Sequence, residues 1–103
     1  MKLLAVTTTV ATLEAARRVA RTLVERRLAA CAEISAIESF YAWQGKIAND
    51  PEFRILFKTT DDRYQAVESA IRELHEYELP AIDAVPLERV SEPYGRWVEE
   101  SCR

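Results

Sequence analysis

Apolar and polar positions divide the chain into alternating strand-like and helix-like segments. The first segment, residues 2–9, contains an unbroken apolar run, Leu3 to Val6, which is typical of a central strand buried on both faces. Apolar residues then recur at three- and four-residue steps from Leu13 to Arg27. This spacing predicts a helix lying on a sheet, and Thr12 is placed to cap its N-terminus.

The middle of the chain predicts a long β-hairpin. Residues 28–43 and 52–59 are rich in aromatic and β-branched residues, and they flank a short loop at 44–51. The alternation slips between Ile34 and Ile37, which predicts a β-bulge. A hairpin of this length is longer than one small domain needs to cover its own core, so we expect it to pair with another subunit or to form part of a site. The residues expected at its tip are Trp43, Lys46, Asp50 and Glu52.

A second helix and a fourth strand follow. Asp61 and Asp62 favour the start of the helix through capping and the helix dipole, and the helix must end before Pro80. Residues 81–87 are strand-like. Because proline cannot donate a hydrogen bond to a neighbouring strand, Pro86 predicts that this strand lies at an edge or ends there.

The chain closes with a short helix that Ser91 can cap, with Pro93 in its first turn. The element order is therefore β-α-β-β-α-β plus a C-terminal helix. This order predicts a single α+β domain over residues 1–103, a ferredoxin-like plait whose antiparallel sheet carries both main helices on one face. The other face is left without helices, so we expect a homo-oligomer that covers it.

Composition narrows the classes of function. A formal charge of −3 and a pI near 5.2 argue against a surface that binds nucleic acid. The N-terminus lacks the features of a signal peptide, and no apolar run approaches the roughly 18 residues of a membrane span. We therefore expect a cytoplasmic protein. Because that compartment is reducing and Cys31 and Cys102 are far apart in sequence, we expect free thiols rather than a disulfide between them.

Candidate chemistry is gathered near the strand ends. Residues 75–78, His-Glu-Tyr-Glu, offer an imidazole and carboxylates, which are ordinary ligands of divalent metals, and Cys31 could add a thiolate. Each residue also has a structural interpretation: His75 as a packed residue at a helix C-terminus, and Cys31 as a small buried side chain. Nothing in the sequence pairs a nucleophile with a base, so we do not expect an enzyme.

Five motifs resemble those of one known family. Residues 25–31 (ERRLAAC), 41–47 (YAWQGKI), 57–60 (FKTT), 75–80 (HEYELP) and 94–97 (YGRW) are similar to segments of the CutA family of divalent-cation tolerance proteins. The matches run in the same order from the first strand to the last helix. The resemblance therefore covers essentially the whole chain.

The resemblance implies a cytoplasmic, non-enzymatic homotrimer with a ferredoxin-like fold, whose long hairpins reach between subunits. It implies a role linked to divalent cations, copper especially, without an obligatory cofactor. The metal ligands that it suggests are His75, Glu78 and Cys31. The other residues that it gathers in a cleft between subunits are Tyr41, Trp43, Glu52, Lys58 and Tyr77.

The chain departs from the family pattern at three positions. Glu76 replaces a proline and Ala81 replaces a glutamate in the family's His-Pro-Tyr-Glu-x-Pro-Glu run, and Thr8 stands where some members carry a cysteine associated with copper. The family also resembles the PII signalling proteins. An alternative function is therefore a PII-like sensor that binds a small anionic metabolite between subunits, with Lys58 as an anion contact.

Overall fold

The computed structural model describes all residues 1–103 and confirms the predicted α+β plait. The elements follow in the order β1 (Leu3–Val10), α1 (Leu13–Glu25), β2 (Cys31–Trp43), β3 (Lys46–Thr60), a 3₁₀ turn η1 (Asp61–Arg63), α2 (Tyr64–Leu74), β4 (Ile82–Pro86) and α3 (Glu92–Ser101). The four strands form one antiparallel sheet in the order β2-β3-β1-β4. As predicted from Pro86, β4 lies at an edge of the sheet.

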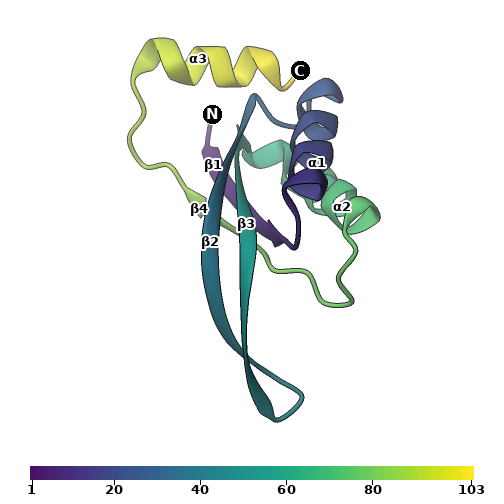
Figure 1. The fold of residues 1–103 in the computed structure, drawn as a ribbon. Coiled ribbons are helices and arrows are strands. Elements are labelled where there is room, and N and C mark those ends of the chain that lie inside the picture. Colours follow the sequence, from purple (N-terminus) through teal and green to yellow (C-terminus); the bar gives the residue numbers. More distant parts are fainter.

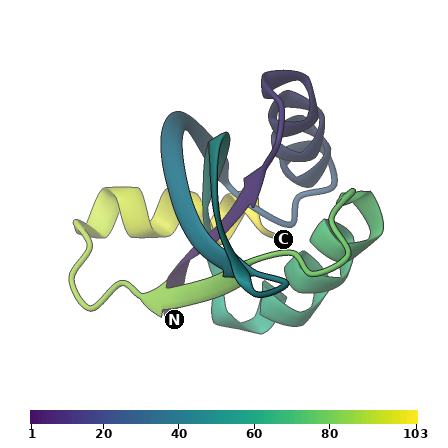
Figure 2. The same cartoon turned by 60° about the horizontal axis from the view of Figure 1, so that its bottom comes forward.

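The main core lies between one face of the sheet and the helices α1 and α2 (Figures 1 and 2). Val6 of β1 and Phe57 of β3 are register partners, and both are fully buried against α1 residues such as Leu23. The Thr12 hydroxyl accepts a hydrogen bond from the Ala15 N–H at 3.0 Å, so the predicted cap of α1 is confirmed.

The C-terminal helix α3 crosses one end of the sheet, on the side away from α1 and α2 (Figure 2). Val98 and Cys102 pack there with Leu3 and Ala30 in a second, smaller cluster. Ser91 occupies the predicted N-cap position of α3, but its side chain makes no capping hydrogen bond.

The β2–β3 hairpin extends far beyond the other two strands of the sheet, β1 and β4 (Figure 1). The predicted loop at 44–51 is wrong, because the strands pair continuously down to Trp43 and Lys46, and the turn consists of Gln44 and Gly45 alone. Both turn residues have positive φ, 50° and 78°, as a type I′ hairpin turn requires. Pro51 is tolerated within β3 because β1 pairs only with residues 53–60, which leaves one side of β3 free.

The predicted bulge between Ile34 and Ile37 is also wrong. Every β2 residue from Cys31 to Trp43 has one partner in β3. The two isoleucines simply lie on opposite faces of the ribbon, because side chains alternate along a strand. No helix in the structure has the length and apolar character needed to cross a membrane.

Candidate functional site

His75 is the first residue after α2 and adopts an extended conformation. Its ring Nε2 lies 2.8 Å from the Thr9 carbonyl oxygen, and its Nδ1 accepts the Tyr77 N–H at 3.1 Å. Because a carbonyl oxygen can only accept, Nε2 carries the proton and Nδ1 presents its lone pair. The two contacts therefore fix a neutral imidazole in one tautomer, with Nδ1 directed to the more exposed side.

Tyr77 connects this histidine to the hairpin. Its hydroxyl donates to Glu52 Oε2 at 2.7 Å, and its ring lies 4.8 Å from the His75 ring. Glu52 is only 7% exposed, so Tyr77 supplies the hydrogen bond that a buried carboxylate requires. Burial and the hydrogen bond to Glu52 raise the pKa of Tyr77 well above its ordinary value, which keeps its hydroxyl protonated as a donor.

A second tyrosine–carboxylate pair lies next to the first on the hairpin. The Tyr41 hydroxyl donates to Asp50 Oδ2 at 2.8 Å, and this bond raises the pKa of Tyr41. Asp50 and Glu52 project from the same side of β3, since they are two residues apart. No basic side chain forms an ion pair with either carboxylate within the chain. These two carboxylates of the hairpin therefore have no ion-pair partner within the chain.

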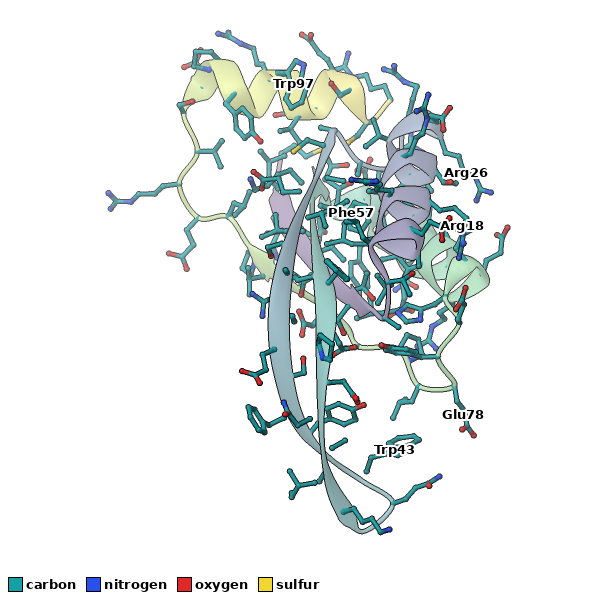
Figure 3. The ribbon with its side chains drawn as sticks, viewed as in Figure 1. Arg18, Arg26, Trp43, Phe57, Glu78 and Trp97 are labelled. Atoms are coloured by element: carbon teal, nitrogen blue, oxygen red, sulfur yellow. The ribbon has the colours of Figure 1, made fainter.

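Trp43 and Glu78, two further residues expected at the site, lie on different segments of the chain. Trp43 is half-exposed beside the hairpin turn, and Glu78 is exposed on the segment between α2 and β4 (Figure 3). Neither forms a side-chain hydrogen bond or an ion pair, so both are free to meet a ligand or a second chain.

Lys58 and Cys31 form a separate cluster under α3. They are register partners on β3 and β2, so their side chains project from the same side of the sheet. The Lys58 ammonium lies 5.7 Å from the centre of the Tyr94 ring and 3.6 Å from Glu33 Oε1, and the Cys31 sulfur lies 3.6 Å from the Tyr94 hydroxyl. We did not expect Tyr94 or Glu33 here from the sequence. Glu33 is two residues from Cys31, the register partner of Lys58, so cross-strand pairing could have indicated it, whereas the position of Tyr94 depends on how α3 folds back.

The structure thus brings together some of the expected site residues and separates others. His75, Tyr77, Glu52 and Tyr41 belong to one cluster, whereas Cys31 lies beside Lys58. The distance between the two clusters can be measured along β1. His75 contacts Thr9, and Lys58 pairs with Ala5, and these two β1 residues are four positions, or about 13 Å, apart. Within one chain, no group of three or more His, Cys, Asp or Glu side chains is placed to hold a metal ion.

The structure also shows where the three residues that depart from the family pattern lie. Thr8 is 1% exposed in the core, so it offers no accessible atom at the position where some relatives have a cysteine. Glu76 is exposed and forms an ion pair with Arg18 at 3.5 Å. Ala81, at the start of the β4 segment, is exposed and carries no polar atom in its side chain.

Fold and site together define a class of protein, a ferredoxin-like α+β domain with a projecting hairpin and a histidine–tyrosine–carboxylate cluster at its base. The model of the CutA1 divalent ion tolerance protein family matches residues 4–101 of this chain. The chain therefore belongs to the CutA1 divalent ion tolerance protein family.

Individual relatives agree with this assignment. The divalent-cation tolerance protein CutA of Archaeoglobus fulgidus is 38% identical over 93 residues, which cover 90% of this chain and 91% of that protein. The solved structure of the A. fulgidus protein, described as periplasmic, superimposes with a TM-score of 0.96 at 35% identity and covers 98% of this chain and 99% of that one. CutA1 from Oryza sativa superimposes with a TM-score of 0.97 at 33% identity over 100% of this chain and 95% of that one.

Proposed function

We propose that this divalent-cation tolerance protein is a non-enzymatic homotrimer that binds divalent cations, Cu²⁺ in particular, between its subunits through His75. The family is described by tolerance of divalent ions rather than by a reaction, which supports a binding role. The number of subunits and the preference for copper come from the resemblance of the motifs, and both remain proposals.

The tautomer of His75 is the observation that carries the proposal. A histidine that binds a metal through one ring nitrogen almost always donates its other N–H to a carbonyl or carboxylate, which orients the ring. In this chain the Thr9 carbonyl accepts from Nε2, and Nδ1 keeps the lone pair that a cation needs. A cation at Nδ1 would replace the Tyr77 N–H, whose bond to His75 is exposed.

One chain does not complete such a site, because no further ligand reaches His75 within it. We therefore place the other ligands on Glu78 of the same segment and on a neighbouring subunit, where Cys31 is the soft donor expected from the family resemblance. The uncompensated carboxylates Asp50 and Glu52 would add attraction for cations near the same cluster.

Calorimetric titration of Cu²⁺ and Zn²⁺ tests the site. We expect His75→Ala to weaken Cu²⁺ binding at least about 10-fold and Glu78→Gln to weaken it by a smaller factor. Glu76→Gln is the matched control, because Glu76 is a neighbouring carboxylate that pairs with Arg18, and it should bind like the unsubstituted protein. Equal, weak binding by the unsubstituted protein and His75→Ala would rule out this site.

A PII-like sensor is the second candidate function, and Lys58 is the residue that favours it. Its side chain is 20% exposed, and its carboxylate partner Glu33 is itself mostly exposed, so a small anion could displace Glu33. Thermal stabilisation by an anionic metabolite that is lost in Lys58→Met would favour this candidate.

We further propose a cytoplasmic location. Because the A. fulgidus relative is described as periplasmic, cell fractionation is needed to test it.

A further inference from the structure

We propose that Tyr77 competes with the cation for His75, so that occupancy of the cation site releases residues 76–79 from the hairpin. The connection at issue is the Tyr77 bridge, which consists of two hydrogen bonds: Tyr77 N–H to His75, and Tyr77 hydroxyl to Glu52 of β3. This inference rests on the proposed function, because it concerns the regulation of the same site.

The competition follows from the single free lone pair of the His75 ring. Nε2 carries the proton and lies 2.8 Å from the Thr9 carbonyl, in a partly buried contact that holds the ring against β1. Nδ1 accepts the Tyr77 N–H at 3.1 Å, and one lone pair cannot bind a cation at the same time. Because Thr9 keeps the ring in place, the Tyr77 N–H has to move away when Nδ1 binds a cation.

Tyr77 transmits this movement to the hairpin, because one residue makes both bonds of the bridge. Its hydroxyl donates to Glu52 Oε2 at 2.7 Å, and Glu52 is only 7% exposed. Hydrogen bonds weaken steeply when their distance or angle departs from the preferred range. A displacement of the Tyr77 backbone therefore weakens the contact with Glu52 as well.

Little else holds residues 76–79. Their backbone makes no hydrogen bond to the backbone of another element, and Leu79 is 71% exposed. Glu76 pairs with Arg18 at 3.5 Å, but both side chains are exposed, and exposed ion pairs contribute little to stability. The Tyr77 bridge is therefore the main attachment of this segment, and its opening leaves the segment free to move.

Calorimetric titration of Cu²⁺ into the assembled protein tests the competition. Tyr77→Phe removes the hydroxyl that keeps the bridge closed. It should tighten Cu²⁺ binding about 5-fold, because one hydrogen bond of ordinary net strength shifts the fraction of open molecules by about that factor. If Tyr77 only supported the site, the same variant would bind Cu²⁺ more weakly. Tyr41→Phe is the matched control and should change binding less than about 2-fold, because the exposed Tyr41–Asp50 pair lies within the hairpin.

A second background separates the bridge from charge. Tyr77→Phe also frees the Glu52 carboxylate, which could itself attract the cation. Glu52→Gln removes that charge and keeps an oxygen that accepts the Tyr77 hydroxyl. Adding Tyr77→Phe to Glu52→Gln should therefore still tighten binding about 5-fold relative to Glu52→Gln alone. No gain in this background would assign the effect to charge and overturn the proposal.

Carbon-13 NMR of the carboxyl groups gives a structural measurement on the unsubstituted protein, with diamagnetic Zn²⁺ as the probe. Saturation with Zn²⁺ should move the Glu52 carboxyl signal toward its position in metal-free Tyr77→Phe, and it should leave the Asp50 signal nearly unchanged. A Glu52 signal that does not respond to Zn²⁺ would overturn the bridge.

Two outcomes separate this inference from the proposed function. If His75→Ala binds Cu²⁺ as well as the unsubstituted protein does, both fail, because Tyr77 then has nothing to compete for. If His75→Ala weakens binding but Tyr77→Phe leaves it equal or weaker, the cation site stands and the competition alone fails.

Discussion

Thr8 illustrates how a single buried atom can limit stability. Its side chain lies in the main core between β1 and the helices, and its hydroxyl is the one buried side-chain polar atom without a hydrogen-bond partner. Burying a hydroxyl without a partner costs about 1–3 kcal/mol. By contrast, the Thr59 hydroxyl, equally buried, donates to the Leu28 carbonyl at 2.6 Å.

We therefore expect Thr8→Val to raise the free energy of unfolding by about 1 kcal/mol, because valine has nearly the same shape and needs no hydrogen bond. Thr59→Val is the matched control and should lower that free energy by about 1–2 kcal/mol. Urea unfolding at equal protein concentration measures both values. A Thr8→Val variant that loses as much stability as Thr59→Val would contradict this explanation.

At the scale of elements, α3 is held to the domain by two arginines. The Arg63 side chain donates from Nε to the Cys102 carbonyl at 2.6 Å, and Arg27 donates to the carbonyls of Arg103 and Glu100 at 2.5 and 2.7 Å. The last carbonyls of a helix have no partners within it, and the helix dipole places negative partial charge there. These guanidinium groups supply both hydrogen bonds and a compensating charge.

Replacing Arg63 by methionine should lower the free energy of unfolding by about 2 kcal/mol and speed amide hydrogen exchange in the last turn of α3. Arg96→Met removes an arginine that pairs only with the exposed Glu92 on the same helix, so it should change stability by less than about 0.5 kcal/mol. Unchanged exchange in α3 of Arg63→Met would show that this contact does not anchor the helix.

The elements also show what the sequence could and could not predict. Apolar spacing predicted every strand and helix in order, because α1 and α2 each bury one periodic face and β1 is buried along most of its length. Asn49, Asp50 and Pro51 are typical turn residues, and they favoured a loop that does not exist. Continuous pairing with β2 overrides their local preference, and Gln44–Gly45 makes the turn instead.

The candidate site could be predicted only in part, because some of its contacts join residues that are far apart in the sequence. His75 and Tyr77 are close in sequence, so their proximity could be expected. The contact of Tyr77 with Glu52 and the position of Tyr94 over Lys58 join residues that are 25 and 36 positions apart. Such contacts depend on how loops and α3 fold back onto the sheet, which no local pattern specifies.

At the scale of the whole molecule, the chain is more extended than a compact domain of its length. Its dimensions are 45 × 25 × 22 Å and its radius of gyration is 14.2 Å, whereas a compact chain of this length has about 13 Å. The hairpin accounts for the extension (Figure 1). Phe40 and Ile47 on its outer half are 68% and 75% exposed. Exposed apolar residues on a projecting ribbon are expected to be covered by other copies of the chain.

We therefore expect Phe40→Ser combined with Ile47→Ser to weaken assembly strongly, because the variant would no longer offer these two exposed apolar side chains to another copy of the chain. Val24→Ser is a control for a partly exposed apolar residue away from the hairpin, on α1, and should leave assembly intact. Gel filtration over a range of protein concentrations compares the variants. Identical elution of the double variant and the unsubstituted protein would contradict a role of this surface.

The mass of the unsubstituted protein in solution tests the proposed trimer directly, because the proposed cation site is completed only by neighbouring subunits. Light scattering at micromolar concentration should give three times the 11.8 kDa of one chain, about 35 kDa. A stable species of 11.8 kDa at that concentration would contradict both the trimer and the site between its subunits.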